Sequence, residues 1–578
     1  MKGMRGVEPE SEPRIGVFVC HCGTNIGGIV DVPAVVEVTR DLRYVVHAAG
    51  NLYTCASDGI AAIQHAIGEH DLNRVVVASC TPRTHSTLFM RACADAGLNP
   101  YLFEFVNIRD QCSWVHMREP EKATEKAKDL VRMGVAKAAL LEPLEKIEIP
   151  MTPSAMVIGG GVAGLKAASI IANSGFEVYL VEKEPELGGM VRKFHRVYPS
   201  NRLALEFLEP LIRSVEENDN VNVLTSTKVT EVKGYVGNFE VTVSTSGKRG
   251  ESRFKVGTII VATGAEVLKP DGLYGYGEYS KVMNQMELDH FISKGDIQDL
   301  KSVVMIQCCG TRDVNGLTYC SRVCCMAALK NALAIKEMDP TSKVTILYRD
   351  VQTQGVSYEA LYKAARHARV RFIRYSPTRE PKVEAVTSPD GRLRVDFFDE
   401  LIGRHSSIEC DRVVLSSPLV PHHDSLDLSK ILRVPRGKDK FFFEAHVKLR
   451  PVDFATDGIF LCGTAHGPKD ITDCIIQALG AAGRALALLR NDRIEGEPIV
   501  SIVDENLCTG CGTCFSLCPY GAIERTQDDK ARVLEALCKG CGVCTSSCPE
   551  FAINLLGFTN EQILAQMCSA LQDTPGAK

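Results

Sequence analysis

Short apolar runs alternate with stretches of helical periodicity along most of this chain. The runs at 15–19 (IGVFV) and 74–79 (RVVVAS) are each followed by patterns in which apolar residues recur every three to four positions. Buried parallel strands are typically continuous apolar runs, and crossover helices connect them. The first segment, to about residue 150, is therefore predicted to be a small parallel α/β unit.

The same alternation resumes after a proline-bearing stretch, IEIPMTPSA. Strands are predicted at 155–159 (AMVIG) and 178–182 (VYLVE), with a helix between them, and again at 302–307 and 343–348. The pattern returns with IFLCG and a long helical stretch at 470–489. The fold class is therefore α/β with several domains.

Composition narrows the class of function. The 578 residues carry 66 basic and 71 acidic side chains without a Lys/Arg-rich block, which argues against nucleic acid as a partner. No apolar run reaches 18 residues, and the start, MKGMRGVEPESEPR, lacks a signal-peptide pattern, so we expect a cytoplasmic protein with no direct membrane span. In a reducing compartment the 23 cysteines indicate metal or redox chemistry.

The most specific motif is CxxCxxCxxxCP, which occurs twice near the C-terminus. It is the bacterial ferredoxin pattern for two [4Fe–4S] clusters, in which the fourth cysteine of each repeat binds the other cluster. Zinc is the alternative, but four-ligand zinc sites would leave cysteines unused. The predicted ligands are Cys508, Cys511, Cys514 and Cys548 for one cluster, and Cys538, Cys541, Cys544 and Cys518 for the other.

A glycine motif lies between the predicted strand and helix near residue 160. Gly159, Gly161 and Gly164 form GxGxxG, and Glu182 ends the next predicted strand. Such glycines allow a tight turn and close approach to a pyrophosphate at a helix N-terminus, and the acidic residue can accept hydrogen bonds from ribose hydroxyls. The motif by itself indicates a dinucleotide.

Two later segments, TIIVATGAEV and GIFLCGTAHGPKDITDC, resemble the flavin-contacting segments of two-dinucleotide-domain flavoproteins such as thioredoxin reductase. This resemblance implies FAD, with the N-terminus of the 470–489 helix directed at the flavin. No second glycine motif follows the strand at 302–307, so the nicotinamide site is expected to be lost. The further cofactor-binding residues implied are Val162, Ala163, Lys183, Gly189, Ala262, Thr263, Gly264, Gly463, Lys469, Asp470 and Ile471.

Together with VCHCGTNIGG, NLYTC, VVVASCTPR, QCCGTRD and YCSRVCCMAALKNA, these motifs resemble the heterodisulfide reductase A-subunit family (HdrA) over nearly the whole chain. The resemblance implies a [4Fe–4S] cluster beside the flavin, held by Cys308, Cys320, Cys324 and Cys325; Cys309 is the rival of Cys308. It also places Lys330 near flavin N5, where a cation would stabilise reduced flavin. The alternative for Lys330 is a solvated helix lysine. This chain resembles a short form, without an inserted ferredoxin module.

The N-terminal cysteines are predicted to hold a fourth cluster. Cys20 and Cys22 follow one apolar run and Cys80 another, at the carboxyl ends of parallel strands where ligand crevices open. Cys55 is the expected fourth ligand and Cys112 its rival, while buried free thiols are the alternative for the whole group. Cys93 is expected in the core. The tail residues Ile563, Leu564, Met567 and Leu571 share a helical face that either docks a partner or packs on the ferredoxin domain.

The resemblance implies an oxidoreductase that moves electrons between FAD and about four clusters, and it implies flavin-based bifurcation. Expected partners are heterodisulfide reductase subunits B and C, a hydrogenase or dehydrogenase donor module, ferredoxin and a second copy of the chain. The alternatives are a component of a quinone-interacting membrane-bound oxidoreductase and a non-catalytic wiring scaffold. The expected domains are an N-terminal α/β domain (1–148), an FAD-binding domain (149–300 and 441–496), a second α/β domain (301–440), a ferredoxin domain (497–557) and a tail helix (558–578).

Overall fold

The structure of the protein, a computed structural model, describes residues 12–247, 250–295, 300–314, 316–386 and 391–571. Residues 1–11, part of the stretch that argues against a signal peptide, and residues 572–578 of the tail segment lie outside the described residues. The chain divides into two compact units, Met1–Ile147 with Glu495–Lys578, and Glu148–Ile494. The chain passes from one unit to the other at β5 (Ile147–Pro150) and β24 (Arg493–Gly496).

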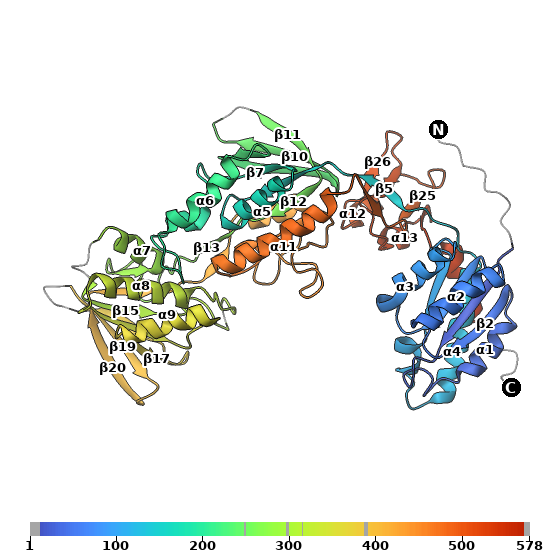
Figure 1. Cartoon of the computed structure of the whole chain (residues 1–578), viewed down its shortest axis with the longest axis horizontal. Coiled ribbons are helices and arrows are strands. Elements are labelled where there is room, and N and C mark those ends of the chain that lie inside the picture. The colour runs from blue at the N-terminus through green and yellow to red at the C-terminus, as the bar shows by residue number, and fades with distance from the viewer. Residues whose placement is uncertain (1–11, 248–249, 296–299, 315, 387–390, 572–578) are drawn as a thin grey trace. The chain divides into compact units, whose positions relative to one another are not determined.

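The N-terminal part of the first unit is a parallel four-stranded sheet, as predicted. Every residue of β1 and β3 is buried, which explains why both are continuous apolar runs. Helix α1 packs beside α4, and α2 packs beside α3 (Figure 1). The strand order is β2 (Val45–Asn51), β1 (Ile15–Cys20), β3 (Arg74–Ser79) and β4 (Phe103–Asn107), and the helices are α1 (Val32–Arg40), α2 (Ser57–Glu69), α3 (Pro82–Asp95) and α4 (Pro120–Ala138). As expected, Cys93 on α3 is fully buried.

The ferredoxin module consists of two small antiparallel ribbons and two short helices. Their bounds are β25 (Ser501–Val503) paired with β28 (Ile553–Leu555), β26 (Ile523–Arg525) paired with β27 (Ala531–Val533), α12 (Thr513–Leu517) and α13 (Val543–Ser546). Each helix follows two of the cysteines in its repeat and carries the third. The duplicated motif thus folds into two similar halves.

The tail helix α14 (Asn560–Ala570) packs against α4 of the N-terminal domain rather than on the ferredoxin module. Arg132 Nε donates to the Ser569 carbonyl at 3.0 Å, and Gln562 Nε2 donates to the Leu140 carbonyl at 2.8 Å. The predicted apolar face stays exposed, because α14 turns its polar residues Gln562 and Ser569 inward. The exposed apolar residues are Ile563, Leu564, Met567 and Leu571.

The second unit contains a parallel five-stranded sheet in the order β23 (Ile459–Leu461), β12 (Thr258–Val261), β6 (Ser154–Ile158), β7 (Glu177–Val181) and β8 (Val221–Leu224). Helices α5 (Val162–Asn173) and α11 (Ile471–Leu489) lie side by side on it (Figure 1). The elements that complete this region are η2 (Gly189–Lys193), α6 (Ala204–Glu216), α10 (Ser425–Leu432), η4 (Gly463–Ala465) and the antiparallel sheet β11 (Glu251–Val256), β10 (Asn238–Thr245) and β9 (Thr227–Tyr235).

A second parallel sheet has the order β14 (Val282–Asn284), β21 (Arg412–Leu415), β15 (Ser302–Ile306), β16 (Lys343–Tyr348) and β17 (Arg371–Arg374). Strand β14 belongs to it although it precedes residue 301, where the sequence places the start of this domain. The remaining elements are α7 (Gln285–Ser293), α8 (Cys324–Met338), α9 (Val356–His367), the sheet β18 (Lys382–Ala385), β19 (Leu393–Asp399) and β20 (Arg404–Cys410), and the pair β13 (Ala265–Val267) and β22 (Leu419–Pro421).

Among the described residues, α11 is the one helix that by length and composition could cross a membrane. It buries a row of small residues, Ala478, Ala481, Ala482 and Ala485, in the core that it shares with α5. Small side chains let two helix backbones approach closely, which accounts for its alanine-rich sequence. A buried core helix passes the same test of length and apolarity.

Candidate functional site

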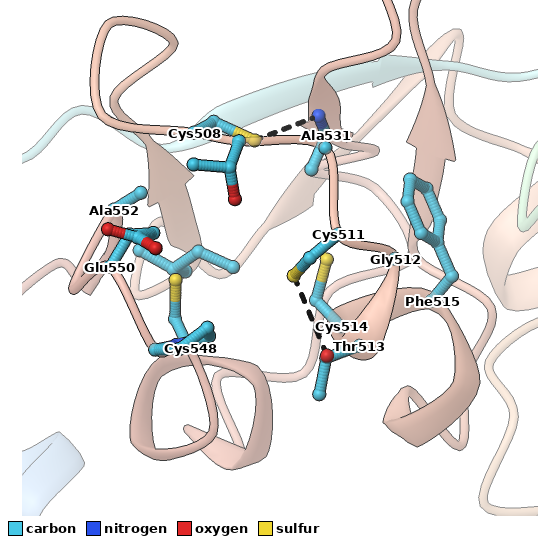
Figure 2. Close-up of a pocket in the computed structure, with 14 residues that line it drawn as sticks. Cys508, Cys511, Gly512, Thr513, Cys514, Phe515, Ala531, Cys548, Glu550 and Ala552 are labelled. Carbon is cyan, nitrogen blue, oxygen red and sulfur yellow. Dashed lines mark hydrogen bonds between the residues drawn. The ribbon is translucent and has the colours of Figure 1, made fainter.

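Four cysteines of the ferredoxin module line one cavity, shown in Figure 2. Cys508, Cys511 and Cys514 come from the first repeat, and Cys548 comes from the end of the second. The loop between the first three turns sharply, because Gly510 and Gly512 adopt φ values of 71° and 84°. The structure therefore brings together the set predicted for one cluster, including the ligand crossed over from the other repeat.

The second repeat repeats this geometry. Ser501 lies between Cys538 and Cys544: its N–H donates to Cys538 Sγ at 3.4 Å, and its Oγ lies 3.3 Å from Cys544 Sγ. Gly540 and Gly542 have φ values of 60° and 73°. The fourth predicted ligand, Cys518, belongs to the same small buried cluster as Cys544.

The cysteine sets fit iron–sulfur clusters by the chemistry of their donors. Thiolates suit such clusters, and hydrogen bonds to the sulfurs help to set their potentials. Backbone N–H groups donate to sulfur at three ferredoxin positions: Ser501 to Cys538, Ala522 to Cys518 at 3.3 Å, and Ala531 to Cys508 at 3.4 Å. The exposed Cys511 has a lowered pKa because hydrogen bonds from Thr513 favour its thiolate.

The central cysteines gather at the carboxyl end of β15 and the start of α8. Cys308, Cys320, Cys324 and Cys325 lie close enough for their charges to interact. Burial raises the pKa of the Cys308 and Cys324 thiols and raises that of Cys325 to about 12. A metal centre must displace the protons from these thiols, which would couple its binding to pH.

Cys308 and Cys309 have different surroundings. Cys308 has a left-handed backbone (φ 63°), and the Arg312 guanidinium lies 3.9 Å from its sulfur. Cys309 is fully buried in a hydrophobic cluster, and its sulfur lies 3.1 Å from the Ile306 carbonyl. A strained non-glycine residue often marks a functional position. The arrangement favours Cys308 as the ligand.

In the N-terminal domain, Cys20, Cys22, Cys55 and Cys80 converge on one place. The charge of Cys55 interacts with those of the other three, and Cys22 has a left-handed backbone (φ 46°) like that of Cys308. The Thr54 N–H donates to Cys20 Sγ at 3.4 Å. These four thiols form a donor set suited to a cluster.

Cys112 lies elsewhere. Its sulfur donates to the Ala123 carbonyl at 3.0 Å, the residue is fully buried, and burial raises its pKa to about 11. Arg109 lies next to the N-terminal thiols instead. Its side chain hydrogen-bonds to Cys22, and its positive charge interacts with Cys80. Cys112 thus has the contacts of a core thiol.

This contrast gives a matched pair of variants. Cys55→Ala should lower the iron content of anaerobically reconstituted protein by about four of about sixteen atoms per chain, because one cluster loses a ligand. Cys112→Ala should leave the iron content unchanged, because that sulfur faces the core. Iron and sulfide analysis checks both. Full iron retention by Cys55→Ala would remove Cys55 from the ligand set, and iron loss from Cys112→Ala alone would put Cys112 in its place.

The flavin motif forms a cradle in which each glycine has a distinct role. A Cβ on Gly164 would lie 1.8 Å from the Gly159 carbonyl oxygen, so this glycine lets α5 approach the preceding turn. A Cβ on Gly161 would meet only Gly189 Cα, at 4.0 Å. Space is therefore open at Gly161, where the pyrophosphate approaches in such folds. The Glu182 carboxylate accepts from the Gly160 N–H at 2.6 Å.

The two later segments of the flavin motif, which contain Ala262 and Gly463, pack against this glycine turn. A Cβ on Gly159 would lie 2.4 Å from the Ala262 carbonyl oxygen, and one on Gly463 would lie 2.8 Å from the Ala163 methyl. Thr263 Oγ1 is buried without a hydrogen-bond partner in the described structure, an orphaned polar atom that a bound cofactor could satisfy. The residues thus fit FAD.

The charged residues predicted at this site have protein partners. Lys469 Nζ donates to the Gly463 and Gly467 carbonyls at 3.0 and 2.9 Å, and burial lowers its pKa to about 8. Asp470 caps α11, of which Ile471 is the first residue, by accepting from the Asp473 N–H. Lys183 Nζ lies 2.7 Å from His422 Nε2 and 3.2 Å from Asp424 Oδ2. Val162 is buried in the first turn of α5.

Lys330 is not a solvated helix lysine. Its side chain is 8% exposed, and Nζ donates to Asp289 Oδ1 at 2.6 Å and to the Arg196 carbonyl at 3.1 Å. The second Asp289 oxygen accepts from the His195 N–H at 2.7 Å. Burial lowers the pKa of Lys330, and Asp289 opposes that change. The pair joins α8 to α7 and to the segment before α6.

Sequence reasoning missed three charged residues at these sites. Arg312 lies within the CCGTRD motif, which offered a signal, and Arg109 follows β4, a strand whose carboxyl end meets those of β1 and β3. Asp289 had no local signal, because its contact with Lys330 depends on the packing of α7 against α8.

Comparisons with known proteins agree with this geometry. Residues 143–306 match the pyridine nucleotide-disulphide oxidoreductase family, and residues 501–555 match the 4Fe-4S dicluster domain. An iron-sulfur A-type subunit of the CoB–CoM heterodisulfide reductase of Methanopyrus kandleri is 40% identical, covering 90% of this chain and 92% of its own length. The A-type subunit of the H(2):CoB-CoM heterodisulfide,ferredoxin reductase of Methanothermobacter thermautotrophicus is also 40% identical, covering 98% of both.

This chain belongs to the heterodisulfide reductase A-subunit family. It is an oxidoreductase component that transfers electrons with FAD and [4Fe–4S] clusters as cofactors. The match to the Methanothermobacter protein extends over 655 residues, more than the 578 of this chain, so that relative carries residues that this shorter HdrA chain lacks.

A thioredoxin reductase of T. acidophilum has a TM-score of 0.41 and 17% identity, covering 58% of this chain and 99% of its own. The assignment of a two-sheet α/β flavoprotein fold rests on the two parallel sheets and on the matched pyridine nucleotide-disulphide oxidoreductase family.

Proposed function

We propose that this HdrA chain divides electron pairs by flavin-based bifurcation. One observation carries the proposal: the loop of the central cysteines is tied directly to the flavin region. Arg322, between Cys320 and Cys324, forms an ion pair at 2.8 Å with Asp473 in the first turn of α11. Half-buried Tyr198 is near Cys324, Asp470 and Cys474 together. A flavin in the cradle would thus have a one-electron carrier as its neighbour.

FAD and the clusters would supply different electron-transfer steps. FAD, when bound, accepts an electron pair and releases electrons singly, and clusters transfer single electrons. The chain's own residues bind and orient: Gly159, Gly161, Gly164, Glu182, Gly189, Thr263 and Gly463 would hold the flavin. The proposed cluster ligands are Cys20, Cys22, Cys55 and Cys80; Cys308, Cys320, Cys324 and Cys325; Cys508, Cys511, Cys514 and Cys548; and Cys538, Cys541, Cys544 and Cys518.

The name of the Methanothermobacter relative includes hydrogen, a heterodisulfide and ferredoxin. That supports a complex in which a hydrogenase or dehydrogenase module supplies electron pairs. Subunits of the B and C type would carry one branch to a disulfide, and ferredoxin would take the other. We also propose that two copies of this chain form the centre of the complex.

An electron count tests bifurcation. The complex, purified anaerobically with its partners, should oxidise two equivalents of a two-electron donor while reducing one disulfide by two electrons and two ferredoxins by one electron each. Ferredoxin reduction should stop when the disulfide is omitted. Ferredoxin reduction that continues without disulfide would indicate a simple relay. Electron delivery to a quinone instead would favour the membrane-bound alternative, and a flavin that the donor never reduces would favour the scaffold.

Lys330 is proposed to stabilise reduced flavin. Lys330→Met should shift the flavin midpoint potential negatively, because the cation is lost. It should also lower the free energy of unfolding by about 3–5 kcal/mol, since Asp289 would remain buried without its partner. Lys330→Arg, which keeps the charge, should preserve the potential. Anaerobic redox titration of both proteins checks this, and an unchanged potential in a folded Lys330→Met protein would limit Lys330 to a structural role.

A further inference from the structure

A cavity of about 500 Å³ lies at the carboxyl end of the second parallel sheet, within the size range of ligand pockets, roughly 300–1,000 Å³. Arg312, Arg349 and Arg374 line it, and they follow or end the adjacent strands β15, β16 and β17. Open parallel sheets bind ligands outside the carboxyl ends of their strands. The proposed electron transfer gives this cavity no role.

The wall of the cavity contains a buried arginine with one unsatisfied donor. The Arg349 side chain is only 8% exposed, and it donates to the Arg312 carbonyl at 3.2 Å and to Glu380 at 2.8 Å. Its Nε is buried and has no hydrogen-bond partner within the described part of the chain. A buried unsatisfied donor is costly, and proteins tolerate such groups mainly where a ligand or function compensates.

Arg374 is available to an anion. It is exposed and lines the cavity, and its Nε donates to the Arg349 carbonyl at 3.2 Å. In the residues that the structure describes it has no ion-pair partner. A guanidinium offers paired donors that match phosphate or carboxylate oxygens.

Asp350 gives the cavity a second kind of recognition. It directly follows Arg349 after β16, pairs with Arg312 at 2.8 Å and is 44% exposed. An acidic residue after the second strand of a dinucleotide-binding sheet typically accepts hydrogen bonds from ribose hydroxyls. Together with Arg374, it suits a ligand that has both hydroxyls and a negative group.

An apolar side chain completes the lining. Leu401, at the turn between β19 and β20, is 73% exposed. The Glu400 N–H donates to the Arg374 carbonyl at 3.2 Å, which anchors this turn to the end of β17. An exposed leucine at the edge of a polar cavity offers a surface for a flat ring.

A whole dinucleotide would not fit this sheet in the usual way. Its pyrophosphate would lie at the turn after β15 and the N-terminus of the next helix, where Cys308 and Cys324 stand. An acidic protein is also a poor match, because Asp350 and Glu400 both line the cavity. We propose that the cavity binds a nucleoside phosphate, with its ribose at Asp350, its phosphate at Arg374 and its base against Leu401.

Adenosine 5′-monophosphate is a suitable probe, because it carries one phosphate for Arg374 and leaves both ribose hydroxyls free for Asp350. Titration calorimetry with the full-length, anaerobically reconstituted chain should show saturable binding of one molecule per chain. Arg374→Ser should weaken binding at least about tenfold, because a charge-assisted contact is lost. Arg371→Ser is the matched control: this arginine is exposed at the opposite end of β17 and should leave affinity unchanged.

Three results would overturn the assignment: no saturable binding at millimolar probe, equal affinity of Arg374→Ser and the unmodified protein, or full competition by inorganic phosphate with none by adenosine. Loss of ferredoxin binding in Arg374→Ser without any nucleotide binding would also replace it with a protein-docking surface. Circular dichroism of each variant excludes misfolding. Binding needs no electron transfer, so failure here leaves bifurcation untouched.

Discussion

Protein carrying Gly161→Ala should fold normally and bind FAD at least about tenfold more weakly. A Cβ at this position would meet only Gly189 Cα, at 4.0 Å, so no protein atom obstructs it. The methyl would instead occupy the space where the pyrophosphate approaches the backbone. The substitution should therefore weaken FAD binding without lowering the stability of the fold. Flavin absorbance per chain after reconstitution measures the loss, and thermal unfolding of the flavin-free protein measures stability.

Two other glycines complete this experiment. Gly164→Ala should lose both stability and flavin, because its Cβ would lie 1.8 Å from the Gly159 carbonyl oxygen and α5 would have to move. Gly483→Ala, on the exposed side of α11 with no atom within 4 Å, should keep its flavin and gain about 0.5–1 kcal/mol from helix propensity. Flavin retention by Gly161→Ala at the unmodified level would show that the cofactor does not approach this turn.

The second large effect is expected at the adjacent pair Cys308 and Cys309. Cys308→Ala should remove the central cluster and with it about four of about sixteen iron atoms per chain. The sulfur of Cys308 lies near those of Cys320, Cys324 and Cys325. Its left-handed backbone is strained, and a bound metal would compensate for that strain. Electron paramagnetic resonance of the reduced protein should lose one cluster signal while the ferredoxin signals persist.

Cys309→Ala should keep its iron. Its sulfur is packed among apolar residues and lies 3.1 Å from the Ile306 carbonyl, so the substitution leaves a small cavity and lowers the free energy of unfolding by about 1–2 kcal/mol. The two substitutions lie one position apart in the chain, yet only Cys308→Ala should lose iron. Iron loss from Cys309→Ala with iron retained in Cys308→Ala would reverse the ligand assignment.

The pattern of the sequence predicted the parts of this protein that depend on local spacing. The α/β class, with its two parallel sheets in the second unit, follows from continuous apolar runs, which occur where a strand is buried on both faces. The first unit's parallel sheet follows in the same way. The ferredoxin motif and the glycine turn are short segments whose geometry depends on neighbours within a few residues. Their local structures could therefore be anticipated without knowledge of distant contacts.

Tertiary structure decided between candidate residues that the spacing of the sequence could not separate. Cys55 and Cys112 were rival candidates in the chain, but only the packing of the N-terminal sheet shows Cys55 among the other thiols and Cys112 facing Ala123. For the apolar face of α14 the sequence left two alternatives, a partner or the ferredoxin module; α14 packs on α4 through Gln562 and Ser569, which leaves that face exposed and contradicts the second alternative.

The sequence could not predict the environment of Lys330 either, because its partner Asp289 is 41 positions away and contacts it only when α7 packs on α8. The arginine cavity likewise forms only when β15, β16 and β17 lie side by side. In each case the deciding contact joins residues far apart in the chain. A sequence pattern specifies which face of an element is buried, whereas the direction of one side chain within that face depends on the elements that pack against it.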